Sequence, residues 1–365
     1  MASQALHLSW FNPVHITFGA HCLQQVPVDH EVVVLADRSA LSPSHESILR
    51  ERLGPRCKGW SWIHSGLASI DQALQLAQTL WPVMQAHPEA VVLAIGGGST
   101  LDLAKVLRFR LETQDIPQAT HFWRTNTLPA RSTRHALWAV PTTAGTGSEV
   151  TRWSTVWDTS AVPQTKLSWA PADGFANRAF VDPELTLSCP LRVTRDCALD
   201  TLSHALESLW NRNANAVTSA LALQAAQGVI QTLPHLLKNP QEVAARASMA
   251  RASLLAGLAM SQTQTALAHA LSYELTLHEG IPHGEACALW LPMVWELALG
   301  QTHLCDSKLA QVFGGDATQG PHLMQHWLED LGIQCRDLRA DPGGVATLAK
   351  EMQSTRGRNF IAQHA

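Results

Sequence analysis

Several common signatures are missing from this sequence, and each absence excludes a class of protein. No stretch of 18 or more apolar residues occurs, which excludes a membrane-spanning helix. The first residues, MASQALHLSWFNPVHITFG, have no basic start followed by an apolar run, so they are not typical of a signal peptide. The 26 Lys+Arg do not exceed the 30 Asp+Glu, and a net charge of −4 argues against a nucleic-acid-binding protein.

Cysteine pairs are also missing. The seven Cys form no CxxC pair and are odd in number, which favours the reduced thiols of a cytoplasmic protein over a disulfide framework. A hydrophobic content of 46% with 15% charged residues excludes a disordered chain. Tyrosine occurs only once, at Tyr273, whereas the chain has 18 His. These two counts have no explanation from composition alone.

The chain changes character near its middle, and 365 residues suggest about two domains. Before residues 182–190, short β-branched segments alternate with a helical one, which predicts a parallel α/β sheet with crossover helices. After them, Ala- and Leu-rich segments of helical length dominate. We therefore expect an α/β domain over 1–185 and an all-helical domain over 186–365. The predicted strands are 31–37, 90–96, 135–141 and 179–182; the predicted helices are 70–85, 198–210, 216–237, 242–258, 264–277, 285–299 and 307–313.

Two glycine-rich turns follow predicted strands. Residues 96–100 (GGGST) precede a helix, so glycines and free N–H groups at its start could cradle a phosphate, although a plain turn is the alternative. Asp102, one turn into that helix, either contributes to the cofactor site or complements the helix dipole. The second turn, 141–151 (PTTAGTGSEVT), offers hydroxyl and N–H groups. Asp37 ends the first predicted strand, where an acid suits a ribose diol and favours NAD(H) over NADP(H).

A possible metal site lies in the helical half. Asp200 and His204 are four residues apart, so a helix would place the carboxylate and imidazole on one face. His269, His278 and His283 follow within apolar segments. One carboxylate with several imidazoles suits Fe(II) or Zn(II) rather than Ca(II) or Mg(II). The alternative for the first pair is a solvated helix surface.

The motifs GGGSTLDLAK, PTTAGTGSEVT, VDPELTLSCP, ALDTLSHALES and HALSYELTLHEGIPHG, in this order, resemble the iron-containing (group III) alcohol dehydrogenase family. The resemblance implies a Rossmann-like domain followed by an all-α domain, the dehydroquinate synthase-like fold, and a homodimer or larger homo-oligomer. It also implies a divalent metal, Fe(II) with Zn(II) as the alternative, held by Asp200, His204, His269 and His283. The implied cofactor-binding residues, with Asp102 added as above, are Asp37, Gly97, Gly98, Ser99, Asp102, Thr142, Thr143, Thr146 and Lys166.

Within the family, the chain is similar to phosphonoacetaldehyde reductases. This implies NAD(P)H-dependent reduction of a small aldehyde to a primary alcohol, with 2-hydroxyethylphosphonate as the product. Tyr273 stands where many members have a histidine, so either Tyr273 or His278 could donate the proton, or both could be structural. Arg152 and Arg358 are candidates to hold the phosphonate, and Arg356 is interpreted as surface charge.

Other functions stay open at this point. The substrate could be a plain alcohol, a diol or maleylacetate. A dehydroquinate-synthase-like lyase uses the same scaffold but would have a denser set of Lys and Arg. A non-catalytic protein of this fold would have no reason to keep the metal ligands.

Overall fold

The computed structural model describes residues 8–362, except 65, 112–115, 117, 129–131, 163 and 336–341. The chain divides into two compact units, Pro13–Pro190 and a second formed by Leu191–Ala365 with the N-terminal Met1–Asn12. The division follows shortly after the boundary expected at 185. Of the N-terminal segment, Phe11 pairs with the helical unit through Gln262, whose Nε2 donates to the Phe11 carbonyl at 2.7 Å. Among the described helices, none is long and apolar enough to cross a membrane.

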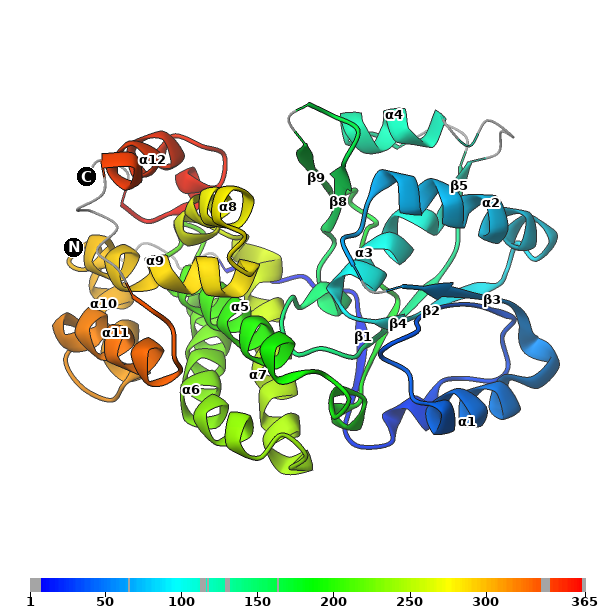
Figure 1. Cartoon of the computed structure of the whole chain (residues 1–365), viewed down its shortest axis with the longest axis horizontal. Coiled ribbons are helices and arrows are strands. Elements are labelled where there is room, and N and C mark those ends of the chain that lie inside the picture. The colour runs from blue at the N-terminus through cyan, green and yellow to red at the C-terminus, as the bar shows by residue number, and fades with distance from the viewer. Residues whose placement is uncertain are drawn as a thin grey trace. The chain divides into compact units, whose positions relative to one another are not determined.

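The first unit is built on a six-stranded sheet in the order β1-β10-β7-β4-β2-β3, with every neighbouring pair parallel (Figure 1). All four predicted strands are present. Two strands of this sheet were missed, and their mixed sequences explain why: HITF is short and half-exposed, and CKGWSWI carries polar residues among its tryptophans. The sheet strands are β1 His15–Phe18, β2 Val32–Asp37, β3 Cys57–Ile63, β4 Val91–Gly96, β7 Leu137–Pro141 and β10 Arg178–Val181.

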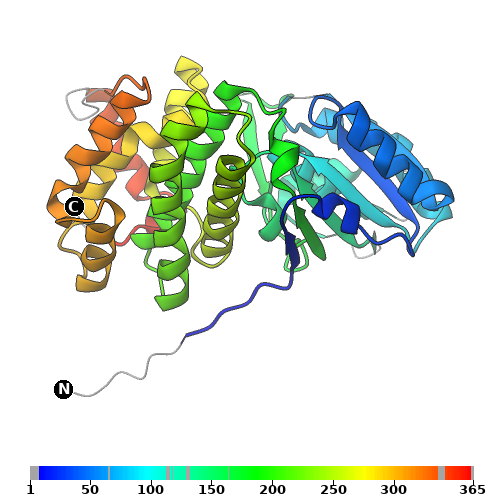
Figure 2. The same ribbon diagram turned by 90° about the horizontal axis from the view of Figure 1, so that it is seen from below.

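Helices cover both faces of this sheet, which is why its central strands are apolar throughout. Along β2, Val33 and Leu35 belong to one core cluster, whereas Val32, Val34 and Ala36 belong to the other. Figures 1 and 2 show α1 on one face and α2 and α3 on the opposite face. The helices are α1 Pro43–Leu53, α2 Ile70–Ala86, α3 Gly98–Leu107 and α4 Gln118–Thr125. Outside the sheet, two pairs of antiparallel strands are β5 Phe109–Leu111 with β6 Ser132–Arg134 and β8 Ser154–Asp158 with β9 Thr165–Trp169.

The second unit consists of helices, as expected, and α5 lies at its centre. Every residue of α5 from Ala198 to Leu209 is buried, because α6, α7 and α9 pack around it. The fold class predicted from the sequence is therefore confirmed. The helices are α5 Leu191–Leu209, α6 Ala216–Lys238, α7 Val243–Thr263, α8 Leu267–Glu279, α9 His283–Ala298, α10 His303–Val312, α11 Gly320–Asp330 and α12 Pro342–Met352.

Short 3-10 turns complete both units. In the first they are η1 Cys22–Gln25, η2 Gly54–Arg56, η3 Ser148–Val150 and η4 Pro183–Thr186, and in the second η5 Ala317–Gln319 and η6 Gly357–Asn359.

Candidate metal centre

The i,i+4 pair on α5 is buried rather than solvated. Asp200 and His204 are each 6% exposed, and His204 Nε2 lies 3.6 Å from Asp200 Oδ1. The His204 ring stacks on that of His269 with centroids 4.6 Å apart. The alternative of a surface pair is therefore excluded by burial.

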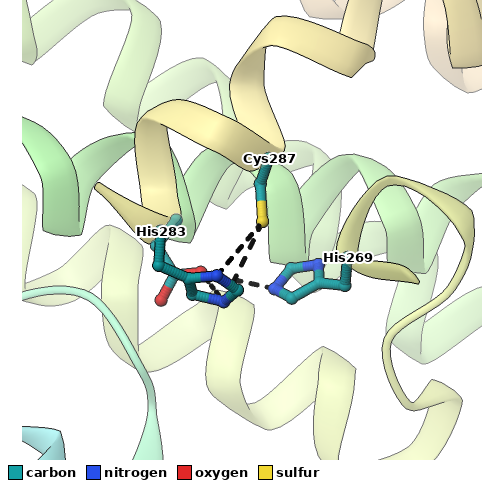
Figure 3. A group of neighbouring side chains, drawn as sticks. His269, His283 and Cys287 are labelled. Carbon is teal, nitrogen blue, oxygen red and sulfur yellow. Dashed lines mark hydrogen bonds and ion pairs between the residues drawn. The ribbon is translucent and has the colours of Figure 1, made fainter. Parts of the chain in front are cut away.

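Two more helices bring imidazoles to the same carboxylate oxygen. His269 on α8 places Nε2 3.3 Å from Asp200 Oδ1, and His283 on α9 places Nε2 3.9 Å from it. Three ring nitrogens thus surround one oxygen. Figure 3 shows the His269 and His283 rings pointing toward each other.

The turn between α8 and α9 explains how His283 reaches this position. Gly280, at φ +68°, ends α8 in the left-handed conformation that favours glycine, and Pro282 precedes the first residue of α9. Gly284, which follows His283, lies so close to α5 that no side chain fits: a Cβ there would lie 2.0 Å from the Asp196 carbonyl oxygen. This contact holds the start of α9 against the turn of α5 that carries Asp200.

The chemistry of these donors fits a divalent cation. Asp200 Oδ1 and His269 Nε2 are buried and make no hydrogen bond among the described residues. Burial opposes ionisation of Asp200, but the neighbouring imidazoles of His204, His269 and His283 outweigh it and hold the pKa of the carboxyl below its ordinary value. Buried polar atoms without partners are rare in proteins, and a cation at their centre would satisfy them.

Glu207 is a site residue that the sequence analysis missed. It is fully buried about two helical turns beyond Asp200, and its Oε2 accepts a hydrogen bond from His269 Nδ1 at 2.7 Å. It also accepts from the backbone N–H groups of Ala266 and His269, at 2.7 and 3.1 Å. A proton on Nδ1 leaves Nε2 with its lone pair directed toward Asp200, the tautomer that metal ligation requires. The i, i+7 spacing after Asp200 was the signal available in the sequence.

Cys287 is a second residue missed. Asp200, His269, His283 and Cys287 have one ligand atom each within 4.8 Å of one another. Cys287 Sγ lies 3.9 Å from His283 Nε2, one turn along α9 (Figure 3). Burial raises the pKa of the Cys287 thiol. Sulfur is a soft donor, so this side chain adds a ligand type that the predicted set lacks.

The two proton-donor candidates lie in different environments. The Tyr273 ring is parallel to that of His283, with centroids 6.2 Å apart. His278 is exposed, on the last turn of α8. Of the two, only Tyr273 is in ring contact with a predicted metal ligand.

The environments of the two arginines near the C-terminus are the reverse of those expected from the sequence, which suggested Arg358 for the substrate site and Arg356 for the surface. Arg358 is exposed, and its Nε donates to the Gln353 carbonyl. Arg356, interpreted from the sequence as surface charge, is half-buried with its guanidinium carbon 5.1 Å from the centre of the Tyr273 ring. That interpretation was wrong because periodicity and composition carry no information on a short irregular tail that packs back on a helix.

In the α/β unit, Asp37 and the two predicted glycine-rich turns lie at the carboxyl ends of neighbouring strands. Register pairs Ala36 with Ile95 and Gly96 with Pro141, so the strands that precede Asp37 and the two glycine-rich turns end side by side. Asp37 Oδ1 accepts from the backbone N–H and the hydroxyl of Ser39, both at 2.8 Å.

The two glycine-rich turns pack directly on each other. A Cβ on Gly97 would lie 3.3 Å from Thr143 Cγ2, and one on Gly98 would lie 2.6 Å from Thr146 Cγ2. Gly97 is also the N-cap of α3, and no side chain caps the first turn of this helix. The start of this helix therefore keeps N–H donors and the positive dipole end toward the second turn. Ser99 lies in that first turn, and the N–H of Thr142 donates to the Gly96 carbonyl at 3.0 Å.

Asp102 has a structural role that the sequence did not reveal. Its two oxygens accept from Ser148 Oγ at 2.7 Å and from the Thr155 N–H at 2.8 Å. Buried Lys105, also missed, donates to Ser148 Oγ and to the Trp153 carbonyl at 2.8 and 2.7 Å. Together they tie α3 to the segment after the second turn.

That segment carries two further candidates from the sequence. Arg152 is half-buried, with its guanidinium carbon 5.4 Å from the centre of the Trp153 ring. Lys166 on β9 faces Trp157 across the hairpin, with Nζ 5.9 Å from the ring centre.

Known proteins are similar to this chain in sequence and in fold. The chain is 34% identical to a probable alcohol dehydrogenase, EutG, of Escherichia coli over 65% of its own length and 62% of that protein, so the match spans less than two thirds of this relative. It is 29% identical to a sulfoacetaldehyde reductase of Bilophila wadsworthia, over 78% of this chain and 72% of that one. The structure of a sulfoacetaldehyde reductase from Bifidobacterium kashiwanohense, in complex with NAD+, matches with a TM-score of 0.86 and 26% identity, covering 98% and 95% of the two chains.

Two family models divide the chain between them. The model described as iron-containing alcohol dehydrogenase matches residues 13–183, and that of the Fe-containing alcohol dehydrogenase family, C-terminal, matches residues 194–341. Together they match most of the chain, which therefore belongs to the iron-containing alcohol dehydrogenase family.

Proposed function

We propose that this protein is a metal-dependent NAD(H) oxidoreductase that reduces an aldehyde to a primary alcohol. The observation that carries the proposal is the convergence of three imidazoles on the buried Asp200 Oδ1. Asp200, His204, His269 and His283 would hold the ion, Fe(II) with Zn(II) as the alternative, and Cys287 is a further donor within reach. When bound, such an ion acts as a Lewis acid that stabilises negative charge on the substrate oxygen.

The remaining parts of the reaction fall to the chain's own residues. Glu207 fixes the tautomer of His269 through Nδ1. Reduction consumes one hydride from NADH and one proton, which must reach the oxygen of the product alcohol. Tyr273 is the better placed donor, because its ring faces His283 whereas His278 is exposed on the last turn of its helix. Tyr273→Phe is expected to lower turnover and to flatten its pH profile, while His278→Gln leaves both unchanged.

NAD(H) is proposed to bind at the sheet edge formed by the two glycine-rich turns. The uncapped start of α3 suits the pyrophosphate, with Gly97, Gly98 and Ser99 around it. Asp37 suits the ribose diol and would repel a 2′-phosphate, so NADH is expected over NADPH. The NAD+ complex of the Bifidobacterium relative supports this choice. Further proposed contacts, from the resemblance, are Thr142, Thr143, Thr146, Lys166 and Asp102, the last acting through the second turn.

The proposed substrate is an aldehyde that carries an oxyanion. The resemblance of the sequence motifs to phosphonoacetaldehyde reductases suggests reduction of phosphonoacetaldehyde to 2-hydroxyethylphosphonate. Two relatives named sulfoacetaldehyde reductase make sulfoacetaldehyde the second candidate. Arg152 and Arg358 are the cations proposed from the sequence to hold the anionic group.

One experiment tests the class of reaction and ranks the substrates. Metal-loaded protein is given NADH or NADPH with phosphonoacetaldehyde, sulfoacetaldehyde or propanal, and in a separate arm NAD+ with 1,3-propanediol, and absorbance at 340 nm is followed. We expect NADH oxidation with the two anionic aldehydes and little with NADPH. Asp200→Ala, which removes the central oxygen, should abolish the reaction. Equal rates with and without metal would contradict the proposal.

A further inference from the structure

Arg356 is a half-buried cation of the helical unit that forms no ion pair with the described residues. Among the described residues its guanidinium makes no hydrogen bond and no ion pair, although the side chain is half-buried. Burial lowers the pKa of this group, and the carboxylate that counteracts the shift is Glu207. Both Glu207 oxygens already accept from Ala266 and His269. A desolvated guanidinium with five donors is costly to leave without an acceptor.

The segment that carries Arg356 is firmly anchored. The N–H of Gly357 donates to Ser354 Oγ at 3.0 Å, and Asn359 Nδ2 donates to the Thr265 carbonyl at 2.9 Å, just before α8. The N–H of Ile361 donates to the carbonyl of Trp210, the residue that follows α5. The segment is thus tied to the ends of two helices that supply metal ligands. Figure 1 shows α8 beside the C-terminal part of the chain.

A tight turn fixes the direction of the segment. A Cβ on Gly357 would lie 1.9 Å from the Glu351 carbonyl oxygen, so the chain folds back on itself immediately after Arg356. Arg356 therefore occupies a defined place and not a free tail.

One aromatic ring separates this cation from the metal centre. The guanidinium carbon lies 5.1 Å from the centre of the Tyr273 ring, and that ring is parallel to His283. A cation–π contact holds a guanidinium over a ring without using its N–H donors, which stay available for oxygen acceptors. The planar fork of arginine matches two oxygens of a sulfonate or phosphonate group.

We infer that Arg356 is the specificity-determining residue that binds the anionic head group of the substrate, a sulfonate or phosphonate, while the carbonyl end lies at the metal centre. The inference rests on the proposed reductase function and assigns to Arg356 the role that sequence analysis gave to Arg358. A two-carbon aldehyde with a tetrahedral oxyanion is the smallest substrate that offers both ends. In the absence of substrate, the Tyr273 ring holds the guanidinium.

The test compares Arg356→Gln with wild-type holoenzyme on charged and uncharged substrates. Sulfoacetaldehyde and phosphonoacetaldehyde supply the two oxyanions, and 3,3-dimethylbutanal and propanal are the uncharged controls. We expect kcat/KM of the preferred anionic aldehyde to fall roughly 10- to 100-fold, the usual value of a lost charged hydrogen bond, with little change for the uncharged ones. For Arg356→Lys, which keeps the charge but not the planar fork, kcat/KM of the anionic aldehyde should lie between the values of wild type and Arg356→Gln.

Binding without turnover gives an independent readout. Ethanesulfonate, titrated calorimetrically into the holoenzyme, should bind wild type and bind Arg356→Gln at least about tenfold more weakly. Arg251→Gln, an exposed arginine on α7, is the matched surface control.

Several results would overturn the inference. An equal loss on charged and uncharged aldehydes would give Arg356 a merely structural role, and no loss on either would remove it from the site. If Arg358→Gln, and not Arg356→Gln, lowers kcat/KM of the anionic aldehyde, the anionic head group is bound by Arg358. If wild type reduces propanal but neither anionic aldehyde, the inference fails while the reductase proposal stands. If wild type reduces no aldehyde, the reductase proposal fails, and ethanesulfonate binding alone decides on Arg356.

Discussion

Glu207→Gln is the substitution whose consequence follows most directly from the geometry. The two carboxylate oxygens accept three hydrogen bonds, from Ala266 N–H, His269 N–H and His269 Nδ1. A glutamine offers one carbonyl oxygen, which can accept two of them, and its amide nitrogen then faces the third donor. At least one charge-assisted hydrogen bond is lost and one buried N–H is stranded, a cost of about 2 kcal/mol.

The hydrogen bond from Glu207 keeps the proton on Nδ1 of His269, so that Nε2 is free to bind the metal. The loss of this hydrogen bond should therefore weaken metal binding. We expect the dissociation constant for Zn(II), measured by competition with a chromophoric chelator, to rise about 10- to 100-fold. Glu274→Gln is the matched control on α8, because among the described residues its exposed carboxylate accepts a hydrogen bond only from Thr347 Oγ1. A dissociation constant within twofold of wild type, with only the metal-free protein destabilised, would refute the positioning role of Glu207.

Three further substitutions test other parts of the account. Gly284→Ala puts a methyl group against the Asp196 carbonyl, so we expect the start of α9 to shift. The free energy of unfolding, measured by urea denaturation, should fall by roughly 3 kcal/mol. The metal affinity, measured by chelator competition, should fall as well. Lys105→Met removes the buried cation 3.9 Å from the partly buried Asp102 carboxylate and leaves the Trp153 carbonyl without its Lys105 donor, so the free energy of unfolding should fall by about 3 kcal/mol. An unchanged urea midpoint would contradict this. Cobalt-loaded wild type should show a near-ultraviolet sulfur-to-metal band that is absent from Cys287→Ser, and identical spectra would remove the sulfur from the metal.

Sequence reasoning located the parts of the molecule whose signals are local. The apolar strands that end in Asp37 and in the glycine-rich turn were readable because a buried parallel strand has a continuous apolar sequence. Asp200 and His204 share one turn of one helix, so spacing alone put them on one face. The strand CKGWSWI escaped because its alternating polar residues give no such signal.

Residues that act only through tertiary contacts could not be found in this way. Glu207 and Cys287 look like ordinary helix residues until three helices come together around Asp200. Arg356 reaches Tyr273 because a short irregular segment packs back on α8, which no periodicity encodes. The resemblance to a family supplied the expected ligand set, but not the side chains that this chain places around it.

We propose that the cluster around Asp200 holds one metal ion per chain, on which aldehyde reduction depends. The most direct test titrates Fe(II), without oxygen, into metal-free protein and follows bound metal and NADH oxidation with an anionic aldehyde together. We expect the rate to rise in proportion to the metal occupancy and to saturate at one ion per chain. Asp200→Ala should neither retain the ion nor react. Full activity of the metal-free protein, or stoichiometric binding by Asp200→Ala, would contradict it.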